Sequence, residues 1–364
     1  MPAPVNLVAW VEQLTADPAS GDMLALHCDD TLAAFLAGLE TEEGGALARL
    51  YARQENPAAL AACAAAIARL SECDDIHLPS CVTPGAIAIP SALSLAEPGN
   101  ALRFPHAVTA SYRAGLALGS AIGGALALGK GVWPTLFAAP AMAALAASVM
   151  QELTAEATAH ALALALGGAG GRLGRPSGSP SGRWYLLAEA VMRGLHAAEA
   201  AKAGFRGDPA ILTEPWLEAA AGHAQIAMEY FSSSSGIESA GFKPFPVARQ
   251  GLNAVEAFRH LLREGLDPAR IESLEVFVPQ QNAMLLSRPI EAEERLSLIA
   301  NAGLQLAFAA FAPDALYEAD RKDELAPHLL EFAARVKIVG TDEFDALLPG
   351  RWPARLAAKS GGRL

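Results

Sequence analysis

One short stretch of the sequence gathers several side chains that could transfer a proton. Within six positions it carries Glu72, Cys73, Asp74, Asp75 and His77. Adjacent negative charges raise the pKa of a carboxylate, and imidazole titrates near neutral pH, so these groups suit a general acid or base. The alternative is a solvated acidic helix end, in which Asp74 and Asp75 bind backbone amides or cap the next helix and His77 is satisfied locally. The residue types alone leave both interpretations open.

This stretch lies between two patterns that are typical of helices. An alanine-rich pattern covers residues 57–70, and an apolar pattern covers residues 86–96. Pro79, Pro84 and Gly85 prevent one continuous helix between them, because proline lacks the amide hydrogen that a helix interior needs. We therefore expect a loop held by two buried helices, a setting in which functional side chains are commonly found.

Helical periodicity runs through the first half of the chain. Apolar residues recur at the 3.6-residue spacing of an amphipathic helix, and no segment alternates cleanly as a strand. Besides the two helices above, the spacing predicts helices over residues 6–14, 22–39, 46–53, 105–129, 134–150, 154–166 and 183–204. A glycine-rich interruption at 167–182 lacks the strand–GxGxxG–helix order, so it does not favour a dinucleotide site.

The pattern changes after a second break at residues 231–246. The elements expected there are helices over 252–262 and 293–311 and short strands over 271–278, 335–340 and 353–358. Helices and strands that follow an all-helical region indicate an α+β domain. We therefore predict a mostly α fold, with a large all-α domain at 1–240 and a smaller α+β domain at 241–364. Part of the helix at 292–311 is expected to pack back on the helical domain.

Composition narrows the possible functions. Of the 364 residues, 52% are hydrophobic and only 6% are aromatic, and the formal net charge is −12. A core built from alanine and leucine favours packed helices over sheet. The acidic balance argues against a nucleic-acid partner, which selects a basic surface.

Cysteine usage and hydropathy favour a cytoplasmic protein. The four cysteines show no CxxC spacing, which argues against structural zinc and against a disulfide framework. The N-terminal residues lack the basic segment that precedes the apolar region of a secretory signal. The most apolar window, residues 114–129, is shorter than the roughly 20 residues of a membrane span, so we expect no membrane partner.

Five segments, in chain order, resemble motifs of the MmgE/PrpD family. The most specific are CDDIH followed by TPGAIAIPSALSLAE, and the lysine–proline segment GFKPFPVARQGLNAVEAF. The others are GKGVWPTLFAAPAMAALAAS, GRWYLLAEAVMRGLHAAEAAKAGFRGDPAIL and RIESLEVFVP. Together the similar segments cover about residues 60–360.

This resemblance implies both a fold and a chemistry. The family includes 2-methylcitrate dehydratase, cis-aconitate decarboxylase and an iminodisuccinate epimerase. Their reactions need no cofactor, and they remove or move a proton beside a carboxylate. The resemblance therefore implies a homodimeric, cofactor-independent lyase or isomerase. Its substrate would be a small carboxylate bound in a cleft between the two domains, with no metal.

The resemblance also implies roles for individual residues. Catalytic roles fall on Asp74, Asp75, His77 and Lys243. Substrate-binding roles fall on Thr83, Trp133, Arg183 and Arg249. Lys243 and Arg249 could clamp a carboxylate, Arg249 through two parallel hydrogen bonds, or they could form an interdomain salt bridge.

Four positions depart from the family pattern. Thr83, Trp133 and Ala248 stand where family members carry histidines, and Glu72 stands at the first aspartate of the acidic motif. Threonine cannot act as a base, and tryptophan offers only a donor and an apolar face. Fewer acids and bases favour a one-base step, such as isomerisation or epimerisation, over dehydration. They also favour a bulkier, less charged substrate.

Two hypotheses of different classes follow from these features. The first is the enzyme described above. The second is a binding or scaffold protein that keeps the fold and has lost the chemistry. Compared with the family pattern, the N-terminal arm is short and the chain ends soon after RWPARLAAKSGG. We therefore expect part of the usual helical domain to be missing.

Overall fold

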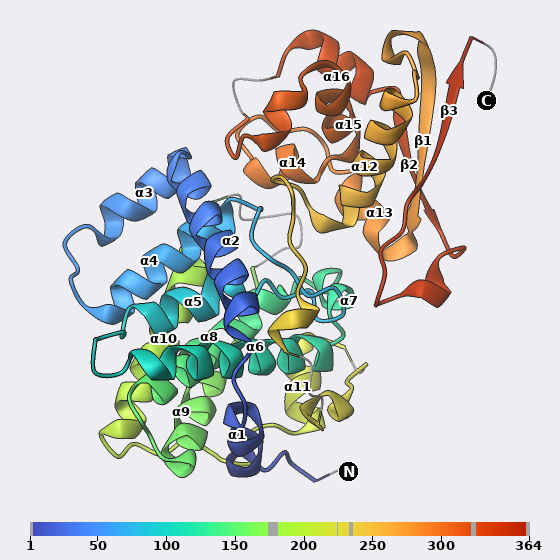
Figure 1. Ribbon diagram of the computed structural model, residues 1–364. Helices are drawn as coiled ribbons and strands as arrows, with labels where there is room; N and C mark the ends of the chain where they lie inside the picture. Colours follow the sequence, from blue (N-terminus) through green and yellow to red (C-terminus); the bar gives the residue numbers. More distant parts are fainter. Residues whose placement is uncertain (1–2, 174–180, 224, 233–235, 322–324, 362–364) are drawn as a thin grey trace. The chain divides into compact units, whose positions relative to one another are not determined.

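The chain divides into two units, each with a large hydrophobic core of its own, and Figure 1 draws the elements of both. The computed structural model describes residues 3–173, 181–223, 225–232, 236–321 and 325–361. The first unit is Met1–Phe242 and the second is Lys243–Leu364. We call them the helical unit and the C-terminal unit.

The described part of the helical unit contains helices and isolated β-bridges but no named strand. The helices are α1 (Leu7–Thr15), α2 (Gly21–Leu39), α3 (Glu42–Tyr51), α4 (Pro57–Leu70), α5 (Gly85–Leu93), α6 (Phe104–Ala121), α7 (Ala125–Leu128), α8 (Pro134–Met150), α9 (Ala155–Gly167), α10 (Gly182–Lys202) and α11 (Glu214–Ala221). The all-α character predicted for this part of the chain is confirmed.

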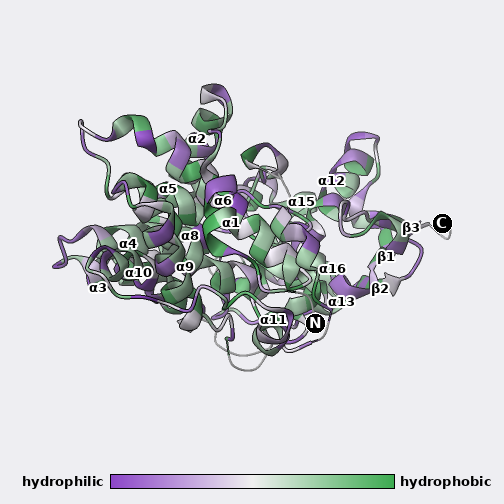
Figure 2. Ribbon diagram, turned by 90° about the horizontal axis from the view of Figure 1, so that it is seen from below, coloured by the Kyte–Doolittle hydropathy of each residue, from purple (hydrophilic) through white to green (hydrophobic). Residues whose placement is uncertain are grey.

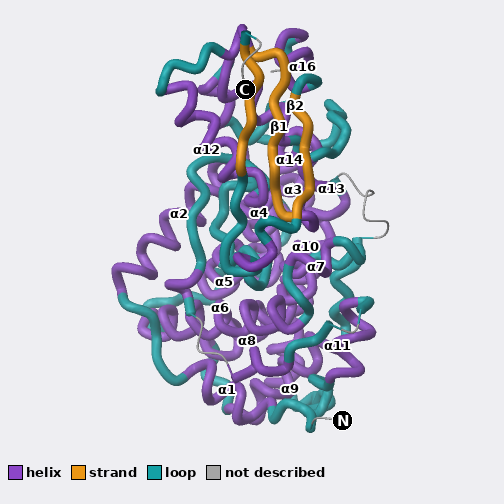
Figure 3. The backbone as a smooth tube through the Cα atoms, turned by 90° about the vertical axis from the view of Figure 1, so that its right-hand side faces the viewer, coloured by secondary structure: helices purple, strands orange, loops and turns teal. Residues whose placement is uncertain are grey.

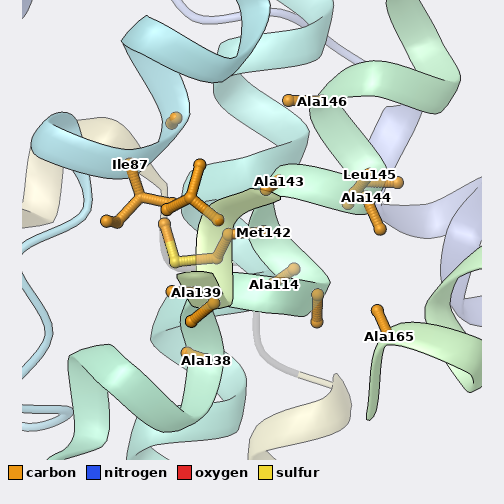
Figure 4. Packing of buried hydrophobic residues seen from close by; sticks show 14 of the residues in the cluster. Ile87, Ala114, Ala138, Ala139, Met142, Ala143, Ala144, Leu145, Ala146 and Ala165 are labelled. Atoms are coloured by element: carbon orange, nitrogen blue, oxygen red, sulfur yellow. The ribbon is translucent and has the colours of Figure 1, made fainter. Parts of the chain in front are cut away.

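Helix α8 forms the centre of the helical unit, and its sequence explains this position. Every residue from Pro134 to Ser148 is buried, so the helix has no solvent-facing side. A helix that is apolar all round must be covered on all sides, and α5, α6, α9 and α10 pack against it. Its apolar character can be followed in Figure 2. Figure 4 shows Met142 of α8 in this packing, with Ile87 of α5 and Ala114 of α6.

Small residues let these helices approach one another closely. A Cβ atom at Gly194 of α10 would overlap the carbonyl oxygen of Pro140 in α8. A Cβ atom at Gly38 of α2 would overlap the carbonyl oxygen of Ile67 in α4. The spacing between these helix pairs is therefore set by backbone contact rather than by interlocking side chains.

Polar side chains cap the first turns of several helices, and α3 begins at Glu42, before the predicted start at residue 46. N-cap residues that accept a hydrogen bond from a backbone amide in the first turn include Asn6, Ser20, Thr41, Asn56 and Thr154. Such caps satisfy amides that have no partner within the helix. They fix the beginnings of α1 to α4 and of α9.

The C-terminal unit combines helices with one small sheet, whose strands lie side by side in Figure 3. Strand β1 lies in the middle, parallel to β2 and antiparallel to β3. The elements are α12 (Arg249–Arg263), β1 (Ile271–Pro279), α13 (Gln280–Leu286), α14 (Arg295–Ala300), α15 (Ala302–Phe311), α16 (Pro327–Ala333), β2 (Val336–Thr341) and β3 (Arg355–Ser360). The expected α+β character of this smaller part is confirmed.

The single long helix predicted over residues 293–311 is wrong. The structure has two helices there, α14 and α15, separated at Asn301. Asn301 has an extended backbone, and its side chain accepts a hydrogen bond from the amide of Leu304 at 2.8 Å. Asparagine competes with helix continuation in this way, because its short side chain caps a new helix.

The helix predicted over residues 105–129 also ends early. Helix α6 stops at Ala121, and the short α7 follows at Ala125. Gly123 and Gly124 between them have φ angles of 84° and 53°. These values belong to the left-handed region that glycine enters at little cost, so the glycine pair turns the chain.

A methyl group added at Gly194 should weaken the contact between α10 and α8. Gly194→Ala is expected to lower the free energy of unfolding by roughly 1–3 kcal/mol through overpacking, although alanine is the better helix former. Gly182→Ala in the same helix is the matched control, because a Cβ there meets nothing within 4 Å. Urea unfolding followed by circular dichroism measures both. Equal stability of the two variants would contradict the close-contact explanation.

Candidate functional site

The loop between α4 and α5, residues 71–84, buries the reactive side chains that the sequence groups together. Glu72, Asp74, Asp75 and His77 are each at most 6% exposed. The expectation that this acidic stretch is exposed to solvent is therefore wrong. Buried charges are costly unless they are paired and hydrogen-bonded, so the partners of each group decide what it can do.

Backbone contacts hold the loop in one conformation. Ile76 and Gly241 exchange two backbone hydrogen bonds, each 2.9 Å long. Glu72 and Cys81 have φ angles of 58° and 54°, in the left-handed region that residues with a side chain seldom occupy. Such conformations cost energy and persist where the surroundings enforce them, often at functional sites.

The carboxylate of Asp75 is fully occupied by donors. Its Oδ2 lies 2.8 Å from His27 Nδ1 and accepts a hydrogen bond from the Tyr112 hydroxyl at 2.7 Å. Its Oδ1 accepts a hydrogen bond from the amide of Gly85, the first residue of α5, at 2.8 Å. Burial and the charge of Asp75 raise the pKa of Tyr112 well above its ordinary value, which keeps the hydroxyl a donor. Asp75 thus binds the first amide of α5, which is the backbone-binding role that the alternative interpretation of the acidic stretch predicts.

His27 is part of this site although no sequence motif points to it. The residue lies in α2, 48 positions before Asp75, and is fully buried. It shares the inner face of α2 with Leu24, Thr31 and Ala34. A histidine on an otherwise apolar or uncharged helix face is the signal that could have identified it, because a buried imidazole needs a partner.

Asp74 faces a buried arginine. Arg69 Nη1 lies 3.3 Å from Asp74 Oδ1 and 2.9 Å from Glu72 Oε2. Burial lowers the pKa of Arg69, but the charges of Asp74 and then Glu72 outweigh it and raise the pKa above its ordinary value. The three charges therefore stabilise one another inside the helical unit.

Two tryptophans extend this cluster of charges. The rings of Trp133 and Trp184 meet edge to face with centroids 6.0 Å apart. The guanidinium carbon of Arg183 lies 4.7 Å from the centroid of Trp133, and that of Arg69 lies 5.2 Å from it. Cations at such distances are attracted to aromatic faces. Trp133 and Arg183 are thus brought together, and Arg69 connects them to the α4–α5 loop.

His77 is held by its own loop. Its Nδ1 lies 2.9 Å from the Ser80 hydroxyl and accepts a hydrogen bond from the Ser80 amide at 3.3 Å. An amide can only donate, so the neutral ring carries its proton on Nε2. Burial lowers the pKa of His77 to about 4, against an opposing effect of Asp75. The ring is therefore uncharged at neutral pH.

Thr83 links the loop to the central helix. Its amide donates to the hydroxyl of Thr135 at 3.2 Å, and the two hydroxyls lie 3.3 Å apart. Thr83 is 1% exposed, and Thr135 lies in the first turn of α8. A hydroxyl at this position can orient a ligand or the loop, but it cannot act as a base.

Lys243 and Arg249 belong to the C-terminal unit. Lys243 is 6% exposed, and Arg249 is the first residue of α12. Arg249 Nη1 is buried and has no hydrogen-bond partner among the described residues. Burial lowers the pKa of this guanidinium. A cation at a helix N-terminus is not stabilised by the helix dipole. A bound anion would therefore stabilise both the Arg249 guanidinium and the N-terminus of α12.

The structure thus groups six of the eight predicted site residues within the helical unit. Four lie on or at the end of the α4–α5 loop and two contact the neighbouring arginine cluster: Asp74, Asp75, His77, Thr83, Trp133 and Arg183. The roles of all eight remain predictions. In the part of the chain that the structure describes, no group of three or more His, Cys, Asp or Glu side chains could hold a metal ion. A membrane-crossing helix is likewise absent from the described residues.

The helical unit is alanine-rich and buries an acidic loop between two of its helices. A model of the MmgE/PrpD N-terminal domain family matches residues 5–228. The chain therefore belongs to the MmgE/PrpD family. The matched region begins well before residue 60, where the recognisable motifs start, and includes the whole α4–α5 loop. A comparison with curated proteins finds no match. Family membership suggests a dehydratase-like or isomerase-like function.

Replacing His77 by asparagine should make the protein less sensitive to acid. In the folded state burial holds the pKa of His77 at about 4, against 6.5 for an ordinary histidine. Between these pH values the unfolded state binds the additional proton. The stability contributed by the neutral ring is therefore present above pH 6.5 and is lost as the pH falls toward 4.

Over that interval the wild type should lose roughly 3 kcal/mol more unfolding free energy than His77→Asn. Urea unfolding at both pH values measures the difference. Identical acid sensitivity of the two proteins would show that His77 is not held neutral by the fold.

Proposed function

We propose that the protein is a cofactor-independent lyase or isomerase that removes a proton beside the carboxylate of a small substrate. The family match over residues 5–228 carries this proposal, because it contains the α4–α5 loop. That loop holds three carboxylates and an imidazole in buried positions, each with a polar partner. Titratable groups in such positions are common at catalytic sites. The proposal includes a cytoplasmic location and a homodimer.

The site residues have two roles in this proposal, proton transfer and substrate binding. Asp75 or His77 belongs to the proton-transfer group, with Asp74 beside it. Lys243 and Arg249 bind the substrate carboxylate. Arg249 Nη1 is a buried donor without a partner among the described residues, and a carboxylate would accept two parallel hydrogen bonds from its guanidinium. Arg183, Thr83 and Trp133 contribute further substrate contacts.

The side chains at the changed family positions favour a one-proton step. Thr83 and Trp133 are 1% and 3% exposed, and neither can act as a base. Expulsion of hydroxide requires a general acid in addition to the base, whereas moving one proton can proceed with a single base. We therefore favour isomerisation or epimerisation over dehydration, and a substrate that is less charged than a tricarboxylate.

A second candidate function is binding without turnover. The observation that favours it is the pairing of Arg69 with Glu72 and Asp74 at 2.9 Å and 3.3 Å. Charges that neutralise each other inside the fold are not free for a substrate. A protein of this kind would keep the family fold and bind a carboxylate unchanged.

Deuterium incorporation distinguishes the two candidates. We expect the protein to exchange the hydrogen beside a carboxylate of a dicarboxylate probe, methylsuccinate or phenylsuccinate, when incubated in deuterated water, as measured by NMR. Exchange without release of water supports the one-proton step. A probe that raises the melting temperature and is recovered without deuterium would instead establish the binding function.

Arg249→Gln should reduce this exchange strongly. Loss of one buried donor to a developing negative charge commonly lowers a rate by about 100-fold. Arg351→Gln is the matched control, because Arg351 carries the same charge in the same unit and is exposed. Equal exchange rates in the two variants would remove Arg249 from the substrate site.

A further inference from the structure

We propose that His27 is the proton acceptor of this reaction and that Asp75 positions it. The assignment rests on the proposed function and identifies its base. It follows from four features: the contacts of Asp75, the unsatisfied nitrogen of His27, the ring of Phe242 that lies against His27, and the opposite polarity of His77.

The contacts of Asp75 determine which nitrogen of His27 carries the proton. His27 Nδ1 lies 2.8 Å from Asp75 Oδ2. The Tyr112 hydroxyl already donates its single proton to the same oxygen at 2.7 Å. A carboxylate accepts hydrogen bonds and does not donate them, so a neutral His27 ring donates from Nδ1 and keeps its lone pair on Nε2. A carboxylate prepares a histidine base in this way in hydrolases.

The lone-pair nitrogen of His27 has no partner in the described part of the structure. His27 Nε2 is buried and makes no hydrogen bond there. Buried polar atoms are nearly always satisfied, and an exception calls for a functional explanation. Every other polar contact of this ring is directed to one side, toward Asp75 and Tyr112.

Two aromatic rings lie against His27: Tyr112, with its centroid 5.4 Å away, and Phe242, the last residue of the helical unit. The ring centroid of Phe242 is 4.6 Å from that of His27, with the planes tilted by 40°. Phe242 is itself 42% exposed, whereas His27 is fully buried. In this proposal Phe242 covers Nε2, and rotation of its side chain opens a path from that nitrogen to the surface.

The two other candidates for the base are less suited. Both oxygens of Asp75 already accept hydrogen bonds, from Gly85, Tyr112 and His27. Nδ1 of His77 accepts a hydrogen bond from the Ser80 amide, so its Nε2 carries a proton and presents a donor. The two histidines thus have opposite tautomers, one suited to accept a proton and one to donate a hydrogen bond.

The proposed step moves one proton and needs no other reactant. The carbon–hydrogen bond beside the substrate carboxylate breaks, and the proton passes to His27 Nε2. The electron pair remains on the substrate and is delocalised into the carboxylate. The imidazolium formed is stabilised by the adjacent carboxylate of Asp75. Return of the proton to the same or a neighbouring carbon completes an epimerisation or isomerisation.

His27→Asn is the decisive variant. The asparagine amide can replace the Nδ1 donor toward Asp75, but it places nothing at the position of Nε2. Deuterium exchange of methylsuccinate and phenylsuccinate should fall by at least about 100-fold, the usual contribution of a general base. His260→Asn is the control and should leave the exchange unchanged, because the His260 side chain is 64% exposed and has no role in the proposed site.

The outcomes separate this proposal from the proposed function. Exchange by the wild type that persists in His27→Asn would overturn the assignment of His27 and leave the proposed function intact. A wild type that exchanges neither probe would overturn the proposed function. Loss of exchange in a His77→Asn variant, with exchange retained in His27→Asn, would show that His77 is the base.

A second measurement needs no substrate. Diethyl pyrocarbonate acylates an imidazole nitrogen that carries a lone pair, and mass spectrometry identifies the modified peptide. Phe242→Ala should make His27 react about tenfold faster than in the wild type. The reagent reacts only with molecules in which Nε2 is accessible to solvent, and removal of the ring should increase their fraction. Phe205→Ala is the control, since Phe205 is 67% exposed in the same unit. Unchanged reactivity in Phe242→Ala would show that Phe242 does not cover Nε2.

The positioning role of Asp75 has its own test. Asp75→Asn presents an amide donor to His27 Nδ1, so the ring should move its proton to Nε2. Nitrogen-15 NMR of the two ring nitrogens measures this change directly. A tautomer identical to that of the wild type would show that Asp75 does not set the polarity of the ring.

Discussion

The buried carboxylate of Asp75 is the interaction on which the site depends. It joins three helices, because its partners are His27 in α2, Tyr112 in α6 and the first amide of α5 at Gly85. There is little free space around it: a Cβ at Gly85 would lie 2.7 Å from the Tyr112 hydroxyl and 2.8 Å from Thr31 Oγ1. A displacement of any one helix would leave a buried charge without a donor, which is strongly destabilising. The loop and its surrounding helices therefore keep one arrangement.

Much of the fold could be predicted from the sequence because it follows from local patterns. The 3.6-residue periodicity identifies most helices of the first unit, and alternation identifies β1. Two of the errors lie where one or two residues end a helix inside an apolar run. Asn301 divides α14 from α15, and Gly123 and Gly124 end α6. Apolar periodicity continues across such residues, so composition alone does not show that the chain turns there.

The site could be predicted only where its members are neighbours in sequence. The grouping of Asp74, Asp75 and His77 is visible in the sequence, but their burial is not, because strings of acidic residues are usually solvated. His27 and Arg69 were missed as partners, since both contacts form through folding rather than through a motif. The two carboxylates differ in their partners: Asp75 contacts a histidine and a tyrosine, whereas Asp74 contacts an arginine.

The contact of α2 with α4 through Gly38 has a consequence for how such a protein can diverge. A single methyl group there meets the backbone of Ile67, which cannot move without shifting a whole helix. A change at Thr83 affects one pair of hydroxyl groups, those of Thr83 and Thr135, and leaves the backbone in place. Positions of this second kind can therefore vary among related proteins while the helices stay in register.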